Sequence, residues 1–266
     1  GIDFKNDFLV VTFEGLVART DFVSQIKNAL SVLQKEYKQP IDIEFASDGE
    51  NLYILQCRSQ SSGIEYKPAT IPVDIPLKKI VFSTNKFVSN GLLSDITHIV
   101  YVDPKKYSEV GDFETLKEIG KTVGRLNRIL PKHQFILMGP GRWGSRGDIK
   151  LGVNVTYSEI NNTSMLIEIA RKTKDYVPDP SFGTHFFKDL VEANISYLPL
   201  YPDEPGVLFN EDFFDNSENV LSSFLPDCSD LSDVIRVIDV PATTGGQVLQ
   251  VLMNGEINKA VALLVE

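Results

Sequence analysis

Residues 41–58 read IDIEFASDGENLYILQCR, and this stretch decides how the first part of the chain folds. Two runs of alternating apolar and polar residues, 41–46 and 52–58, flank the turn sequence SDGEN at 47–51, and this pattern predicts a β-hairpin. Side chains alternate between the two faces of a strand. The alternation predicts one polar face, carrying Asp42, Glu44, Gln56 and Arg58. It predicts an opposite face carrying Ile41, Ile43, Phe45, Tyr53, Leu55 and Cys57.

The polar face combines residue types that suit a metal-bound phosphate. Mg²⁺ prefers oxygen ligands, often one or two carboxylates together with phosphate oxygens of a substrate. Glu44 and the Gln56 carbonyl group offer such oxygens, and Arg58 offers planar N–H donors to a phosphoryl group. The same residues could instead form a solvated sheet face with a cross-strand ion pair, which is common in sheets. The spacing of these residues leaves both interpretations open.

The longer stretch IDIEFASDGENLYILQCRSQ, residues 41–60, resembles the closing hairpin of the ATP-grasp domain in the phosphoenolpyruvate synthase and pyruvate phosphate dikinase family. The shared features are the acidic pair before an aromatic residue, a short Asp/Gly turn and a Leu-Gln-x-Arg run. The resemblance implies that Glu44 and Gln56 hold magnesium, that Arg58 contacts the terminal phosphates of ATP, and that Asp42 supports the same face. It implies a kinase or phosphotransferase reaction that carries a phosphoryl group from ATP toward pyruvate.

The resemblance covers only about residues 8–60. The family's nucleotide-binding lysine, its own glycine-rich loop, its phosphohistidine domain and its pyruvate-binding barrel are not evident in the sequence. We therefore expect this chain to be a fragment or a separate subunit of a longer enzyme, without a complete active site of its own. The expected partners are an upstream nucleotide-binding half, further domains, and a small-molecule substrate such as pyruvate.

The residues around the hairpin complete the first of two predicted regions. FLVVTF at 8–13 predicts a buried strand. Apolar residues at spacings of three and four predict a helix over about 20–38, with Thr20 and Asp21 as caps and Pro40 as its end. Residues 59–76 contain three prolines and show no periodicity, which is typical of a connection between domains. The predicted organisation is the end of an ATP-grasp domain over 1–60, a linker over 61–77 and a second α/β domain over 78–266.

The second region mixes strands with helices, which predicts an α/β or mixed α+β fold class. A helix is expected over about 113–130, where Gly120 and Gly124 lie on one face and could allow close packing. Another helix is expected to start near Thr184, and Asn254-Gly255 marks a hairpin turn. Strands are expected at 79–83, 97–103, 134–138, 153–157, 165–170, 195–200 and 234–240.

The sequence GPGRWGSRGD at 139–148 is a glycine-rich loop after a predicted strand. Successive N–H groups in such a loop can form an anion-binding nest, Arg142 and Arg146 would add charge, and Trp143 could stack on a ligand ring. The loop lacks both the Walker A ending and Gly-x-Gly-x-x-Gly spacing. The alternative is a surface turn with an anchoring tryptophan. A non-catalytic module that binds an anionic metabolite or a partner domain through this loop is therefore the second hypothesis for the chain.

The remaining polar motifs give weaker signals. His185, in GTHFF, precedes a predicted helix and resembles the family's phosphocarrier histidine only in Gly-Thr-His, because Phe186 and Phe187 replace the small residues that follow. A packed or capping histidine is the alternative. The three histidines and two cysteines show no zinc spacing. Three acids at spacings of three predict a solvated acidic turn rather than a calcium loop: Asp227, Asp230 and Asp233.

Composition limits the classes of partner. The formal net charge is -10 and the pI is about 4.9, with no basic run, which argues against nucleic-acid binding. No apolar run reaches the roughly 18 residues needed to span a bilayer, and no signal segment is evident at the start. Two cysteines do not make a disulfide framework. These observations predict a cytoplasmic protein.

Overall fold

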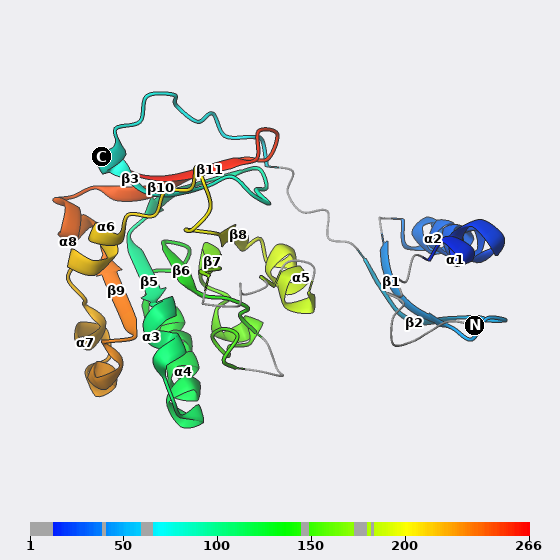
Figure 1. The fold of residues 1–266 in the computed structure, drawn as a ribbon, viewed down its shortest axis with the longest axis horizontal. Coiled ribbons are helices and arrows are strands. Elements are labelled where there is room, and N and C mark those ends of the chain that lie inside the picture. The colour runs from blue at the N-terminus through cyan, green and yellow to red at the C-terminus, as the bar shows by residue number, and fades with distance from the viewer. Residues whose placement is uncertain (1–12, 39–40, 60–65, 145–148, 173–179, 182–183) are drawn as a thin grey trace, which may run out of the picture. The chain divides into compact units, whose positions relative to one another are not determined.

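The computed structural model describes residues 13–38, 41–59, 66–144, 149–172, 180–181 and 184–266, with only the backbone described for Arg58 and Ser59. The chain divides into two compact units, Gly1–Ser62 (unit 1) and Gly63–Glu266 (unit 2). Helices and sheets are mixed, so the fold class is α+β, as predicted (Figure 1). The strand predicted at 8–13 lies outside the described residues except for Phe13.

Unit 1 consists of two helices and a hairpin. Its elements are α1 (Glu14–Arg19), α2 (Phe22–Tyr37), β1 (Ile41–Ser47) and β2 (Leu52–Ser59). The predicted helix is confirmed as α2, but the side chain of Asp21 makes no capping hydrogen bond, and Thr20 Oγ1 accepts the Phe22 N–H instead, at 3.3 Å. Helix α2 ends at Tyr37, and Lys38, the residue after it, has a left-handed φ of 55°.

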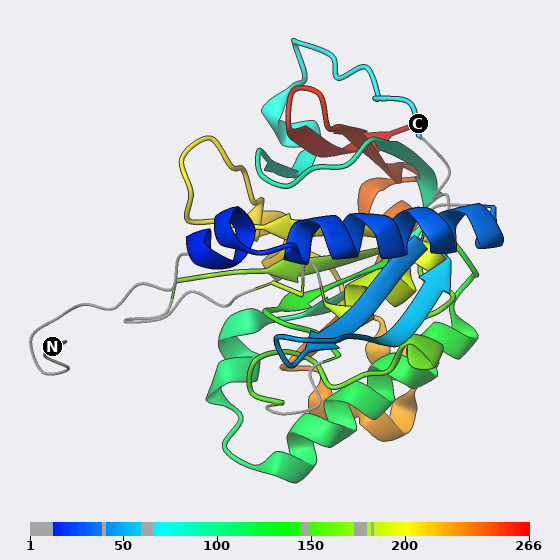
Figure 2. The ribbon, with the colours of Figure 1, turned by 90° about the vertical axis from the view of Figure 1, so that its right-hand side faces the viewer.

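Helix α2 lies across one face of the hairpin (Figure 2). The rings of Phe22 and Phe45 meet there with centroids 5.6 Å apart. No residue of α1 or α2 is buried, and Ile41 is the only buried hydrophobic side chain among the described residues of unit 1. The described residues of unit 1 therefore form almost no core of their own.

The centre of unit 2 is a five-stranded sheet in the order β8-β7-β6-β5-β9, in which β5 to β8 are parallel and β9 is antiparallel. The parallel strands follow one another in order across the sheet, so their connections are expected on one face. Helices α3 and α4 connect β5 to β6, α5 lies between β7 and β8, and all three cover a large core cluster there. The elements are β5 (His98–Val102), α3 (Pro104–Glu109), α4 (Phe113–Ile129), β6 (Phe135–Pro140), β7 (Met165–Ile169), α5 (His185–Glu192), β8 (Ser196–Leu200) and β9 (Ile235–Asp239).

The other face of this sheet packs against a four-stranded antiparallel sheet in the order β3-β11-β10-β4, which lies at the top of unit 2 in Figure 1. The predicted hairpin turn at Asn254-Gly255 is confirmed between β10 and β11. The strand β4 was not predicted. The elements are β3 (Ile80–Thr84), β4 (Gly91–Ile96), β10 (Val248–Asn254) and β11 (Lys259–Val265).

The described part of the expected linker packs on the outer face of this second sheet. Ala69 donates its N–H to the Met253 carbonyl at 3.0 Å, and the Asn254 side chain donates to the Ala69 carbonyl at 3.1 Å. Ile71 and Ile75 join the small apolar cluster beneath. This segment therefore belongs to the fold of unit 2, since its apolar residues complete a sheet face.

The strand predicted at 153–157 is wrong. Residues 153–156 pair with no strand in the described structure, and the short helix η2 (Tyr157–Glu159) follows them. Val153 and Val155 are nevertheless buried, and this alternation mimics a strand. The expected close packing of α4 is confirmed, because a Cβ on Gly120 would lie 2.3 Å from the Asn154 carbonyl oxygen.

The rest of unit 2 consists of short helices that were not predicted. None of the helices in the described ranges is long and apolar enough to cross a membrane. The short helices are η1 (Leu77–Lys79), α6 (Glu211–Asn216), α7 (Leu221–Phe224), η3 (Pro226–Leu231) and α8 (Val240–Thr244).

Candidate functional site

The hairpin register brings the four positions of the polar face together. Asp42 lies directly opposite Arg58, and Glu44 lies directly opposite Gln56. Opposed residues of an antiparallel pair share a face and have Cβ atoms about 5 Å apart. Because Asp42 and Glu44 are two residues apart on β1, both pairs lie on the same face of the hairpin.

A β-bulge follows the pair of Glu44 and Gln56. Phe45 lies opposite Ile54 rather than Leu55, so Leu55 is the extra residue of β2, and its side chain is 66% exposed. The predicted alternation is therefore correct for Cys57 and wrong for Tyr53, which lies opposite Ala46 on the side of the polar face. The inserted residue reverses the alternation beyond it, and bulges of this kind are frequent beside functional sites, where they re-aim a side chain.

The turn of the hairpin is fixed by Asp48. Its carboxylate accepts the N–H groups of Glu50 and Asn51 at 2.9 and 2.7 Å and the Tyr53 hydroxyl at 2.7 Å. These hydrogen bonds, that from Asn51 first, hold the pKa of Asp48 well below its usual range. Gly49 takes a φ of 95°, a conformation that favours glycine. The turn sequence therefore sets the register that opposes the polar residues.

The donor set of the polar face fits Mg²⁺ better than a transition metal. Asp42, Glu44 and Gln56 are half-buried and supply only oxygen ligands. Mg²⁺ commonly takes one or two protein oxygens and completes its octahedron with water and phosphate oxygens. No group of three or more His, Cys, Asp or Glu residues that could hold a metal occurs within the described ranges. A magnesium ion here would therefore depend on a phosphate ligand for the rest of its coordination.

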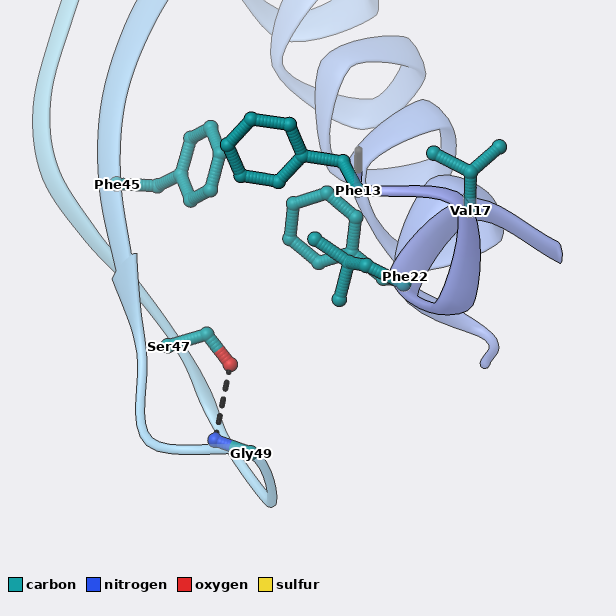
Figure 3. A pocket seen from close by; sticks show the side chains of 7 residues that line it. Phe13, Val17, Phe22, Phe45, Ser47 and Gly49 are labelled. Carbon is teal, nitrogen blue, oxygen red and sulfur yellow. Dashed lines mark hydrogen bonds between the residues drawn. The ribbon is translucent and has the colours of Figure 1, made fainter. Parts of the chain in front are cut away.

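An open apolar pocket of about 610 Å³ lies on the opposite face of the hairpin (Figure 3). The side chains of Phe13, Phe22 and Phe45 gather there. Apart from Ser47 and Gly49, the residues that line this pocket are apolar, so the pocket differs in chemistry from the polar face. Since Phe45 and Glu44 point to opposite sides of β1, this pocket is separate from the polar face.

The described part of the glycine-rich loop, residues 139–144, is folded into the core of unit 2. The main-chain N–H groups are bonded internally: Gly141 donates to the Ile169 carbonyl, Arg142 to the Leu151 carbonyl and Gly144 to the Val153 carbonyl. The main-chain N–H of Trp143 donates to the Glu168 carboxyl group. These N–H groups are therefore not available to an outside anion. Trp143 is 1% exposed, so its ring anchors the loop and cannot stack on a ligand.

Arg142 is half-buried at the carboxyl end of β6, and Arg146 lies outside the described residues. Anion binding by these two arginines stays a prediction. In open α/β sheets ligands bind where the strand order reverses, and the parallel strands of unit 2 run across the sheet in one direction without such a reversal.

Sequence reasoning missed Glu168, which is fully buried in β7. Burial raises the pKa of this carboxyl group, although hydrogen bonds from Ser181, Tyr197 and Trp143 act to lower it. The signal in the sequence was a single acidic residue inside the apolar run MLIEIA at 165–170. A charged residue is almost never fully buried unless it is paired, so such an isolated acid indicates a specific role.

His185 is the first residue of α5 and is exposed, while Phe186 and Phe187 pack against the core, as the sequence indicated. A phosphocarrier role for His185 stays a prediction. The predicted acidic turn is confirmed at η3, where Asp227 pairs with both terminal nitrogens of Arg125 at 2.7 and 2.9 Å. Asp230 and Asp233 are exposed.

The first part of the chain is similar to a known protein family. Residues 14–78 match the family model described as pyruvate phosphate dikinase, AMP/ATP-binding domain. The match includes both helices of unit 1, the whole hairpin and the first residues of unit 2, and it stops before β3. It supports a nucleotide-binding domain similar to that family in this part of the chain. Searches of curated proteins and of solved structures found no significant match.

Proposed function

We propose that the hairpin forms the phosphate end of a Mg-ATP site, in a domain similar to the AMP/ATP-binding domain of pyruvate phosphate dikinase. The observation that carries the proposal is the register, which opposes Asp42 to Arg58 and Glu44 to Gln56 on one face. The match of residues 14–78 to an AMP/ATP-binding domain supports a nucleotide as the ligand.

Each residue of the polar face has a chemical role in this proposal. The Glu44 carboxylate and the Gln56 carbonyl oxygen hold Mg²⁺, which when bound neutralises charge on the terminal phosphates. Arg58 donates to a phosphate oxygen through its planar guanidinium group. Asp42, directly opposite Arg58, orients that guanidinium group.

The reaction class that we propose is phosphoryl transfer from ATP toward a carrier group and finally toward pyruvate, with the hairpin supplying phosphate and metal contacts. Recognition of the base is assigned to other parts of such an enzyme. The apolar pocket of Figure 3 does not take this role, because it lies on the other face of the hairpin from Glu44.

A calorimetric titration tests the proposal. Mg-ATP and magnesium tripolyphosphate are each titrated into the full chain, into Arg58→Ala and into Glu44→Gln. The matched control is Arg19→Ala, because Arg19 is an exposed arginine of α1 in the same unit. We expect weak binding of both ligands with similar affinity, since the site contacts phosphates and not the base.

Loss of one charged hydrogen-bond partner is worth about 2 kcal/mol, so Arg58→Ala should weaken both ligands at least about tenfold. Arg19→Ala should leave both affinities unchanged. Binding of ATP without binding of tripolyphosphate would contradict a phosphate-end site. Equal affinities of Arg58→Ala and the unchanged chain, or no Mg²⁺-dependent binding at millimolar ligand, would contradict it as well.

A further inference from the structure

Glu168 joins three separate segments of unit 2 through four hydrogen-bond contacts. The groups in contact with the Glu168 carboxyl group come from the loop after β6, from the segment before α5 and from β8. The main-chain nitrogen of Trp143 and the hydroxyl oxygen of Ser181 lie 2.7 and 2.6 Å from Glu168 Oε1. The Ser181 N–H and the Tyr197 hydroxyl lie 2.5 and 2.7 Å from Oε2. This carboxyl group therefore ties the glycine-rich loop to the sheet.

The hydroxyl group of Ser181 lies near two hydrogen-bond acceptors but has only one hydrogen to donate. It has one hydrogen, yet both Glu168 Oε1 and the Trp143 carbonyl oxygen lie within hydrogen-bond distance, at 2.6 and 3.1 Å. No other group donates to the Trp143 carbonyl in the described part of the chain. Both contacts are satisfied together only when Glu168 donates a hydrogen to Ser181 Oγ and Ser181 donates its own to the Trp143 carbonyl.

We propose that Glu168 is a protonated carboxylic acid that latches residues 141–144, the described end of the glycine-rich loop, to the sheet, and that its ionisation loosens this latch. In the protonated state the hydrogen on Oε1 points to Ser181 Oγ, while Oε2 accepts the Ser181 N–H and the Tyr197 hydroxyl. Ionisation turns the Ser181 hydroxyl back to Glu168 and leaves the buried Trp143 carbonyl without its donor. An unsatisfied buried carbonyl costs about 1–3 kcal/mol, which weakens the hold on the loop.

The surroundings of Glu168 favour the neutral acid. Its neighbours on β6 and β8 are Gly139 and Pro199, which carry no charge. On the other packed segments the titratable groups are Tyr197, Arg142 and His185, and none of the ion pairs between described residues includes Glu168. An isolated buried carboxylate is costly without a cation, so the group is expected to keep its proton.

The direction of the pH effect follows from this burial. The pKa of Glu168 in the folded chain is raised above 4.5, its usual value. The unfolded chain therefore loses this proton first as pH rises. The stability contributed by Glu168 is fully present below pH 4.5 and is lost as pH rises through the raised pKa of the folded chain. Loosening of the loop is thus expected on the alkaline side.

The only tryptophan of the chain is Trp143, so its fluorescence reports on the latch without any label. The experiment follows the emission maximum of the full chain, of Glu168→Gln and of the exposed control Glu256→Gln from about pH 5 to pH 9, below the usual titration of tyrosine. We expect a shift to longer wavelength with rising pH in the unchanged chain and in Glu256→Gln. Glu168→Gln cannot ionise and should show no such shift.

Infrared difference spectra provide a second readout that does not depend on loop motion. The spectrum of the unchanged chain minus that of Glu168→Gln should contain the C=O band of a protonated carboxylic acid at neutral pH. Absence of that band would overturn the proposal, because Glu168 would then be ionised. A fluorescence shift that persists in Glu168→Gln would overturn it too, since another group would be responsible. If Glu168→Gln fails to fold, Ser181→Ala removes the shared hydroxyl and should move the transition to a different pH.

Discussion

Units 1 and 2 place their polar groups in different environments. In unit 1 the polar face is held on a two-stranded hairpin, and only Ile41 among its described hydrophobic residues is buried. In unit 2 the main-chain N–H groups of the described part of the glycine-rich loop bond internally, to carbonyl groups and to Glu168, beside a five-stranded sheet with a core on both faces. A polar sequence motif can therefore remain accessible in one region and bond internally in another, and burial decides between them.

The largest expected contrast is in stability. Leu126→Ala removes a fully buried side chain from the core of unit 2 and should lower its free energy of unfolding by about 2–5 kcal/mol. The matched change Leu55→Ala, at a side chain that is 66% exposed, should cost less than about 0.5 kcal/mol. Urea unfolding followed by circular dichroism measures both. Similar losses for the two leucines would contradict the difference in packing between the units.

A smaller effect is expected at the contact between α4 and residues 153–156. Alanine at Gly120 would place its Cβ 2.3 Å from the Asn154 carbonyl oxygen, so the backbone must shift. Overpacking of this kind costs about 1–3 kcal/mol, which exceeds the gain in helix propensity of about 1 kcal/mol. Gly120→Ala should therefore lower the melting temperature. Gly111→Ala, with nothing within 4 Å of its Cβ, is the control and should leave the melting temperature nearly unchanged.

The stability of unit 2 should also fall on the acid side because of His98. Burial lowers the pKa of this ring below 6.5, although Asp239 acts to raise it. The unfolded chain takes up a proton first as pH falls, so stability is full above pH 6.5 and declines below it. His98→Gln should flatten this part of the stability profile measured by thermal unfolding. A slope below pH 6.5 that is unchanged in His98→Gln would assign the effect to other groups.

The smallest effect is expected for the ion pair of Arg125 and Asp227. The contact is bidentate, but the Asp227 side chain is 66% exposed, so solvent screens it. Exposed ion pairs contribute little to stability. Asp227→Asn should therefore lower stability only slightly, and most of the loss should disappear in high salt. A larger loss in both low and high salt would show that Asp227 stabilises the fold by more than a solvent-screened ion pair.

Local sequence patterns predicted the elements whose side chains follow one periodicity. Helices α2 and α4 and the hairpin β1–β2 fall within a few residues of their predicted ranges, and the turn between β10 and β11 lies at the predicted Asn254-Gly255. The sequence patterns gave wrong predictions where tertiary packing, not local periodicity, sets the alternation of buried and exposed side chains. Val153 and Val155 alternate because they pack beside α4, and Leu55 breaks the alternation of β2 because a bulge inserts it.

The site was predictable only in part. The composition of the hairpin and its spacing predicted that Asp42 and Glu44 share a face, and the turn around Asp48 then set the opposing residues. The interior role of the glycine-rich loop was not predictable, because its donors are satisfied by carbonyls and by Glu168, which lies about 25 residues away in the sequence. Contacts between distant segments leave no local pattern.

The metal dependence of ATP binding tests the central claim most directly. Affinities for ATP with and without Mg²⁺ are measured for the full chain, for Glu44→Gln, for Gln56→Ala and for the double variant. The account predicts that Mg²⁺ strengthens binding to the unchanged chain, that each single variant loses much of this gain, and that the double variant loses little more, since both residues hold one ion. The same gain from Mg²⁺ in all four proteins would contradict a metal site on the polar face.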